Sequence, residues 1–178
     1  GATVALGVAD AARLLRLGAH PKCVAFGELG LDRHYPEPAQ AHQRRVLDQQ
    51  LEAIRDGDVS KPVVIHCREA FAELLPILKA SGIAPERFVF HCFTGTPDEA
   101  RAVLDFGAFI SFTGVVTYRN ARGVQEAARL VPDGRFMLET DAPFLSPEPV
   151  RGVRPCVPAF TAHTAAKGAD ANVDETGW

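Results

Sequence analysis

The sequence predicts an α/β protein, because short apolar runs alternate with amphipathic segments along the whole chain. The apolar runs are rich in Val, Ile and Phe and do not alternate with polar residues. Such runs are typical of strands that are covered on both faces, as in a parallel sheet. Strands and helices that alternate in this way form right-handed βαβ units. We expect a single domain over residues 1–178.

The expected strands and helices follow from these two patterns. The strands are the six apolar runs, at residues 3–8, 23–26, 62–65, 88–90, 108–112 and 136–138. The helices are expected where apolar residues recur at helical spacing. These stripes are Ala11, Leu14, Leu15 and Leu17; Val46, Leu47, Gln50, Leu51 and Ile54; Phe71, Leu74, Leu75 and Leu78; and Ala100, Val103 and Leu104. A last helix is expected over residues 158–167, followed by an irregular tail.

Thr96-Pro97-Asp98-Glu99 has the pattern of a helix start. Thr96 can cap the first turn, and Pro97 suits the first helical position. Glu99 can complete a capping box with Thr96. The four residues therefore predict that a helix begins here.

Composition excludes several classes of protein. Of the 178 residues, 47% are hydrophobic and 23% are charged, as in ordinary globular domains. No apolar run approaches the roughly 18 residues of a membrane span, and the start lacks a signal-peptide pattern, so we expect a cytoplasmic protein with no membrane association. The four cysteines form no C-x-x-C pair and are expected to be reduced. A net charge of -3 argues against a protein that coats nucleic acid, but not against an enzyme that holds a few phosphates.

Ionisable side chains stand at or just beyond the ends of four expected strands. They are Glu28, His66, His91 and Asp141. The carboxyl ends of parallel strands share one edge, where α/β enzymes place their active sites. One such residue is more often structural, but several at equivalent places are costly to bury unless they are paired or bind metal. Imidazole and carboxylate ligands suit zinc, manganese or magnesium, and hydrolysis is the chemistry that such ions support.

Four motifs, in chain order, resemble signatures of the TatD family of metal-dependent hydrolases. They are Gly27-Glu28-Leu29-Gly30-Leu31-Asp32, similar to GE(I/L)GLD; Ile65-His66-Cys67-Arg68, similar to IHxR; Phe90-His91-Cys92-Phe93-Thr94-Gly95, similar to HCFxG; and Leu138-Glu139-Thr140-Asp141-Ala142-Pro143, similar to ETD(A/S)P. The resemblance extends from Val4 to Ala166. It implies a TIM-barrel-like (β/α)8 fold and a deoxyribonuclease with 3′-to-5′ exonuclease activity on DNA ends or another phosphoester.

The resemblance also implies a role for each motif residue. Two divalent ions are expected, with Mg, Mn and Zn as the candidates. Glu28 would bridge them, and His66 and His91 would bind one of them. Asp141 would hold the other ion and orient or deprotonate the attacking water.

Three further residues have weaker assignments by the same resemblance. Arg68 is a candidate phosphate contact, with a solvated helix start as its alternative. Arg154 is a candidate substrate contact in Arg151-Gly152-Val153-Arg154-Pro155, where the family has RGxRNxP. Glu139 would support the metal ligands.

The sequence departs from the family pattern in two ways. The family begins with an HxH motif on its first strand, which is absent here, and His20, His34, His42 and His163 are expected on the surface. A (β/α)8 barrel has about 250 residues. Because residues 3–8 resemble the family's second strand, we expect the chain to lack the first strand and part of the C-terminal end.

Other interpretations stay open beside this one. The protein could be another metal-dependent, amidohydrolase-like hydrolase; such enzymes often use a carboxylated lysine where Glu28 stands here. It could also be a catalytically impaired domain, because HxH is absent. A doubly wound open sheet is the fold alternative, but the sequence lacks GxGxxG and a P-loop. The sequence does not reveal whether the natural substrate is DNA, RNA or a small phosphoester, and it sets no oligomeric state.

Overall fold

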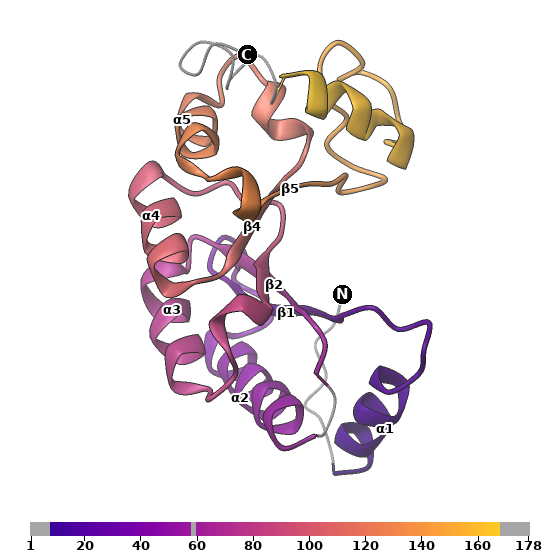
Figure 1. The fold of residues 1–178 in the computed structure, drawn as a ribbon, viewed down its shortest axis with the longest axis vertical. Coiled ribbons are helices and arrows are strands. Elements are labelled where there is room, and N and C mark those ends of the chain that lie inside the picture. The colour runs from indigo at the N-terminus through magenta and orange to yellow at the C-terminus, as the bar shows by residue number, and fades with distance from the viewer. Residues whose placement is uncertain (1–7, 58–59, 168–178) are drawn as a thin grey trace. The chain divides into compact units, whose positions relative to one another are not determined.

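Helices and strands alternate along the chain in the computed structural model, which describes residues 8–57 and 60–167 (Figure 1). The elements are α1 (Val8–Gly18), β1 (Phe26–Asp32), α2 (Gln40–Asp56), β2 (Val63–Arg68), α3 (Phe71–Ala80), β3 (Phe88–Phe90), α4 (Pro97–Phe106), β4 (Phe109–Phe112), α5 (Arg122–Leu130) and β5 (Phe136–Leu138). The short 3₁₀ turn η4 (Pro158–Phe160) leads into helical residues 161–167. The α/β class and the last helix are therefore confirmed.

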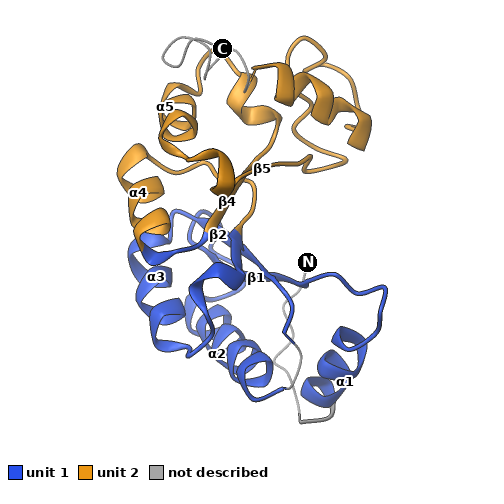
Figure 2. Ribbon diagram, in the orientation of Figure 1, with its two compact units in different colours: residues 1–89, 106–108 blue, residues 90–105, 109–178 orange. Residues whose placement is uncertain are grey.

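Two compact units make up the chain, and Figure 2 colours them separately. The first comprises residues 1–89 and 106–108, and it holds α1, β1, α2, β2 and α3. The second comprises residues 90–105 and 109–178, and it holds most of α4 together with β4, α5 and β5. The boundary falls inside β3. A single domain over the whole chain stays a prediction.

In the first unit, β1 pairs in parallel with β2, and α2 is the crossover between them. Gly30 lies opposite His66, and Asp32 lies opposite Arg68. Helix α2 packs on β1, and α3 packs on β2. The core consists of apolar side chains of the two strands and these two helices, among them Leu31, Val63, Ile65, Val46, Leu47, Ile54, Leu74 and Leu78.

A β-bulge in β1 decides which side chains of this strand face the core. Phe26 pairs with Val63 and Leu29 pairs with Ile65, so two residues, Gly27 and Glu28, stand against one on β2. Such a bulge changes which face the following residues occupy. Phe26 and Leu29 are therefore both buried although they are three residues apart. Within the bulge, Glu28 is exposed and lies on the face opposite the core.

In the second unit, β4 pairs in parallel with β5, and Ile110 lies opposite Phe136. Three aromatic rings, of which Phe93 and Phe112 are buried and Phe136 is half-buried, contact one another in this unit. The ring of Phe112 lies 5.0 Å from that of Phe136 and 5.8 Å from that of Phe93, measured between centroids. Ile110 and Phe112 are fully buried. Helix α5 follows the 3₁₀ turn η2 (Gly114–Thr117) and packs against it.

The expected capping box at the start of α4 is confirmed. The Glu99 carboxylate accepts hydrogen bonds from the backbone N–H and the hydroxyl of Thr96, at 2.7 and 3.0 Å. In return, the N–H of Glu99 donates to the Thr96 hydroxyl over 3.3 Å. Pro97 is the first helical residue, where its missing N–H costs nothing.

The strand ends and one helix differ from the predictions. Strand β1 begins where a strand was expected to end and continues to Asp32, and β2 continues to Arg68, so Glu28 and His66 lie within strands. Polar residues on the less buried face hid these extensions from a search for apolar runs. Leu17 is 57% exposed, whereas Ala11, Leu14 and Leu15 of the expected stripe are half-buried. Of the first expected strand, residues 3–7 lie outside the described residues, as does the tail 168–178, whereas Val8 begins α1.

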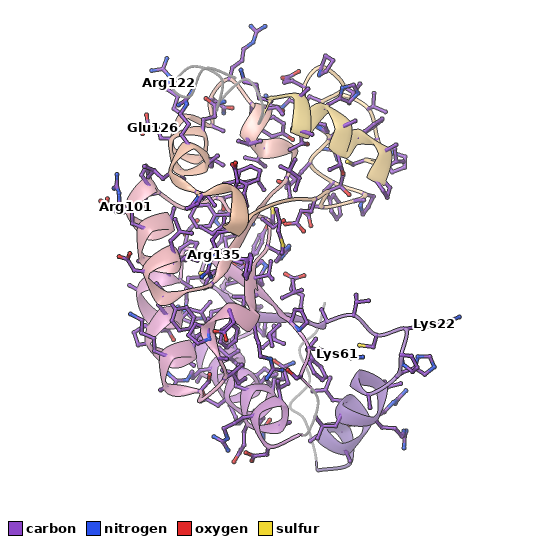
Figure 3. All side chains as sticks on the ribbon, in the orientation of Figure 1. Lys22, Lys61, Arg101, Arg122, Glu126 and Arg135 are labelled. Carbon is purple, nitrogen blue, oxygen red and sulfur yellow. The ribbon has the colours of Figure 1, made fainter. Side chains whose placement is uncertain are left out.

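Helix α5 was not predicted, because its buried stripe is small. Val124, Ala127 and Ala128 face the core of the second unit. Figure 3 shows Arg122 and Glu126 pointing away from this helix on its other side. Two alanines and one valine form too weak a stripe to be recognised in the sequence.

The four cysteines form no disulfide in the described part of the chain, and Cys67 and Cys156 are buried. Among residues 8–57 and 60–167, no helix combines the length and the apolar composition that crossing a bilayer requires.

Gly30→Ala should destabilise the first unit, because β1 and β2 approach most closely at this residue. A Cβ on Gly30 would lie 1.8 Å from the carbonyl oxygen of His66. The backbone of Gly30 also has a φ of +155°, which residues with a side chain rarely adopt. We expect a loss of about 2–4 kcal/mol in the free energy of unfolding, measured by urea denaturation.

Gly123→Ala is the matched control for this substitution. A Cβ at Gly123 in α5 meets nothing within 4 Å. It should leave stability unchanged or raise it by up to about 1 kcal/mol. Equal unfolding midpoints for Gly30→Ala and the parent would contradict the role given to the close approach.

Candidate metal centre

His66 lies between two carboxylates of the neighbouring strand. Its Nδ1 is 2.7 Å from Oε1 of Glu28, and its Nε2 is 3.0 Å from Oδ2 of Asp32. Side chains at every second strand position share a face, so Glu28, Gly30 and Asp32 project together. Because Gly30 is the residue opposite His66 in the register, the two acids lie on either side of the imidazole. The three side chains form what we call the Glu28–His66–Asp32 cluster.

The charges in this cluster stabilise one another. The hydrogen bond to Glu28 raises the pKa of His66 above its ordinary value, burial opposes that rise, and the hydrogen bond to Asp32 adds to it. Burial by itself would raise the pKa of Asp32. Hydrogen bonds from His66 and from the N–H groups of His34 and Tyr35 outweigh burial and hold that pKa below its ordinary value. Without an ion, the cluster therefore favours a charged imidazolium between two carboxylates.

The donors of the cluster fit a divalent ion. A carboxylate oxygen and an imidazole nitrogen are ligands that zinc, manganese and magnesium accept. Two ligands at about 2.1 Å from an octahedral ion are about 3 Å apart, close to the separation of Glu28 and His66. An ion would have to displace the proton on Nδ1, since the metal needs its lone pair. Asp32 would then keep the other ring nitrogen protonated, the usual arrangement of a metal-binding histidine.

Asp32 is a member of this cluster that the sequence reasoning missed. Its Oδ2 contacts His66, and its Oδ1 accepts the N–H of His34 over 2.8 Å. The backbone N–H of Asp32 donates to the side chain of Gln43, which is buried in α2. The spacing of Glu28 and Asp32, four residues apart in a strand, was the available signal.

His91 belongs to the second unit and directly follows β3. The next residue, Cys92, has a φ of 45°, in the left-handed region that favours glycine. The N–H of Cys92 donates to Oε1 of Glu139 over 2.6 Å. The other oxygen of Glu139 lies 3.8 Å from Nδ1 of His91. One carboxylate therefore holds the backbone turn after His91 and faces its ring.

Glu139 stays ionised in this position. Burial would raise its pKa, but the nearby ring of His91, the N–H of Cys92 and the side chain of Ser111 outweigh it, so the pKa lies below its ordinary value. Its own N–H donates to the carbonyl of Phe112 over 3.0 Å, which fixes residue 139 beyond the end of β5. These contacts agree with the supporting role that the motif suggested.

Asp141 lies in a turn that follows β5. Its carbonyl accepts the N–H of Phe144 over 2.7 Å, and its side chain is half-buried. The structure thus brings Glu28 and His66 into direct contact, whereas His91 and Asp141 both belong to the second unit.

The two candidate arginines lie in different surroundings. Arg68 is the last residue of β2, so the alternative of a helix start is wrong, and α3 begins only at Phe71. Its guanidinium carbon lies 5.2 Å from the centroid of the Tyr35 ring. Arg154 is exposed in the loop after β5.

Of the four histidines expected at the surface, two are exposed and two are half-buried. His20 and His34 are exposed as expected, and His34 contacts Glu69 at 2.9 Å. His42 and His163 are half-buried instead. The Nδ1 atom of His42 lies 2.9 Å from the guanidinium of Arg45.

Fold and side chains together describe an α/β protein with an imidazole–carboxylate cluster between parallel strands. Comparison with known proteins gives the family. The family described as TatD related DNase matches residues 6–176. The chain belongs to this family.

Curated relatives support the assignment and span more sequence. The chain is 38% identical to the uncharacterized metal-dependent hydrolase YabD of Bacillus subtilis over 82% of its own length and 56% of the relative. It is 38% identical to the 3′-5′ ssDNA/RNA exonuclease TatD of Erwinia tasmaniensis, over 94% of its own length and 65% of the relative. Human TATDN2, a 3′-5′ RNA nuclease, is 40% identical over 77% of this chain. The chain thus spans a little over half the length of YabD and under two thirds of that TatD.

A solved structure confirms the fold. The chain resembles YjjV, a TatD homologue of Escherichia coli, with a TM-score of 0.83 and 28% identity, over 93% of this chain and 63% of the other. An uncharacterized amidohydrolase of Saccharomyces cerevisiae shares the fold at a TM-score of 0.78 and 17% identity. The predicted TIM-barrel-like α/β class is therefore confirmed.

In metal-free protein, His66 should titrate above the ordinary histidine value of about 6.5. Because its folded pKa is raised, the stability it contributes is fully present below the unfolded pKa and is lost as pH rises through the folded value. Asp32→Asn should lower the pKa of His66, since it removes one of the two carboxylates. The measurement is a two-dimensional NMR titration of the histidine ring signals. Added Zn²⁺ should lower the apparent value further by competing with the proton.

Asp48→Asn is the control for this titration. Asp48 is exposed on α2 and pairs with Arg44 at 2.8 Å, outside the cluster. If Asp32→Asn and Asp48→Asn leave the His66 titration equally unchanged, Asp32 does not act on the imidazole.

Proposed function

We propose that this protein is a metal-dependent phosphodiesterase that removes nucleotides from nucleic-acid ends in the 3′-to-5′ direction. The observation that carries the proposal is the Glu28–His66–Asp32 cluster, with 2.7 Å between Glu28 and His66, in a chain of the TatD related DNase family. One relative named as a 3′-5′ ssDNA/RNA exonuclease and another named as a 3′-5′ RNA nuclease support a nucleic-acid substrate. DNA ends are the first substrate to test, and RNA and small phosphoesters follow.

The metal ligands proposed are Glu28, His66, His91 and Asp141. Glu28 would bridge two ions, with Mg, Mn and Zn as candidates, and each histidine would contribute one nitrogen. Bound divalent ions supply a water of lowered pKa and stabilise negative charge on phosphate oxygens. The acidic residues and neutral imidazoles that this requires are the types present in the four motifs.

The chain's own side chains would perform the remaining tasks. Asp141 is proposed to orient the attacking water and to accept its proton on a carboxylate oxygen. Arg68 and Arg154 are proposed to contact the phosphates of the substrate. The Arg68 guanidinium is planar and presents several N–H donors, which suits the oxygens of a phosphate.

Removal of divalent ions should abolish nuclease activity, and their return should restore it. The assay follows a 5′-labelled single-stranded DNA, with RNA and a small phosphodiester in parallel, before and after dialysis against a chelator. Mg²⁺, Mn²⁺ and Zn²⁺ are then added back one at a time, and the bound metal is measured by elemental analysis. Activity that survives a metal content of zero would exclude the proposal.

Glu28→Ala, His66→Ala and His91→Ala should each reduce turnover by at least about 100-fold. His20→Ala is the matched control, because His20 is an exposed histidine outside the four motifs and should leave turnover unchanged. Near-normal turnover of Glu28→Ala would disprove the bridging role.

The same assays separate the two alternatives. Turnover of amides or lactones without nuclease activity would favour another amidohydrolase-like enzyme. Absence of both metal and turnover would favour an impaired domain, as the missing HxH suggests. A cytoplasmic location stays a prediction, which cell fractionation would check.

A further inference from the structure

Tyr35 is an exposed aromatic residue beside the Glu28–His66–Asp32 cluster. It stands in the loop that follows β1, three residues after Asp32, and 56% of its surface is accessible. A ring with this much accessible surface has a face available for a stacking contact. The accessible part of the Tyr35 ring can therefore contact a ligand.

Two cationic or aromatic neighbours hold the ring in place. The guanidinium carbon of Arg68 lies 5.2 Å from the centroid of the Tyr35 ring, within the range of a cation–π contact. The ring of His34 meets it edge to face, with 4.8 Å between centroids and an angle of 88°. Tyr35 therefore has a defined orientation although it is exposed.

The loop that carries Tyr35 is tied to the cluster by hydrogen bonds. Oδ1 of Asp32 accepts the N–H groups of His34 and Tyr35, at 2.8 and 3.4 Å, while Oδ2 of the same carboxylate contacts His66. Arg33 donates two hydrogen bonds to Glu73, at 2.9 and 2.7 Å. The position of the ring is thus set relative to His66 through one carboxylate.

Arg68 connects the ring to the cluster from the other strand. Arg68 and His66 are two residues apart in β2, so their side chains project from the same face. A guanidinium can stack on a ring and still donate hydrogen bonds in its own plane. Arg68 can therefore orient Tyr35 and contact a backbone phosphate.

We propose that Tyr35 and Arg68 form a stacking subsite for a base of a single-stranded nucleic acid. This inference rests on the proposed function, because it assumes a substrate with bases. Proteins that bind single strands without sequence preference combine aromatic stacking with positive charge along the backbone. Tyr35 supplies the ring and Arg68 supplies the charge, next to the proposed metal ligands. The subsite explains how an enzyme with a net charge of -3 can retain a polyanion through few contacts.

Binding titrations test the subsite without requiring turnover. The probes are a fluorescently labelled single-stranded deoxyoligonucleotide and a matched abasic oligomer, which has the same sugars and phosphates without bases. Both are titrated by fluorescence anisotropy in the presence of a chelator, so that nothing is cleaved. Tyr35→Ala should weaken binding of the normal strand by about 5- to 100-fold and leave the abasic strand unchanged. Tyr35→Phe should bind both strands as the parent does.

Two further variants complete the experiment. Leu17→Ala removes an apolar side chain of similar exposure, 57%, from α1 and should change neither affinity. Arg68→Lys keeps the charge but not the planar group, so it should weaken the normal strand more than the abasic one.

The outcomes separate this inference from the function on which it rests. Equal losses on both strands, or no loss, for Tyr35→Ala would overturn the stacking subsite. A base-dependent loss would support it even if the metal-loaded protein cleaves no nucleic acid, in which case the proposed function alone fails. Normal cleavage by the parent together with unchanged binding by Tyr35→Ala would leave the function standing and remove the subsite.

Discussion

The close parallel approach of β1 and β2 at Gly30 is the constraint on which the first unit depends. No side chain could stand at Gly30, because a Cβ would meet the carbonyl of His66. The bulge before it turns Glu28 away from the core, and strand alternation places Asp32 on the same face. The GELGLD motif is thus a description of backbone geometry as much as of chemistry: its second glycine allows the contact, its leucines fill the core, and its two acids enclose His66.

Electrostatics then connects this geometry to the surface. Asp32 uses one oxygen on His66 and the other on the loop with His34 and Tyr35. A change in the charge of His66, by proton or by metal, is therefore felt by the carboxylate that also anchors the loop. Asp32 therefore contacts both a proposed metal ligand, His66, and the loop that carries Tyr35 of the proposed stacking subsite. Asp32 need not touch the substrate itself to influence how His66 and the ring of Tyr35 are oriented.

Particular elements show how far the sequence predicts the structure. The runs 88–90 and 136–138 matched β3 and β5 because both are wholly apolar. The expected strand 23–26 overlaps β1 only at Phe26, and the expected strand 62–65 stops three residues before the end of β2, because both strands continue through polar residues such as Glu28 and His66. The positions of the motif residues along the chain were readable, but the contact of Asp32 with His66 depends on a bulge that no local pattern reveals. Helix α5 was not predicted from the sequence, because two of the three residues in its buried stripe are alanines.

Each histidine of the proposed site has a supporting carboxylate within its own unit. Asp32 contacts Nε2 of His66 at 3.0 Å, and Glu139 lies 3.8 Å from Nδ1 of His91 while it holds the turn at Cys92. A carboxylate on one ring nitrogen fixes the tautomer and makes the other nitrogen a better donor to a metal. Because Asp32 acts on His66 without an ion, the fold itself orients this imidazole, whereas Glu139 lies near the ring of His91. An ion bound at His66 would have to displace a proton, but the carboxylate of Asp32 would already support that ring.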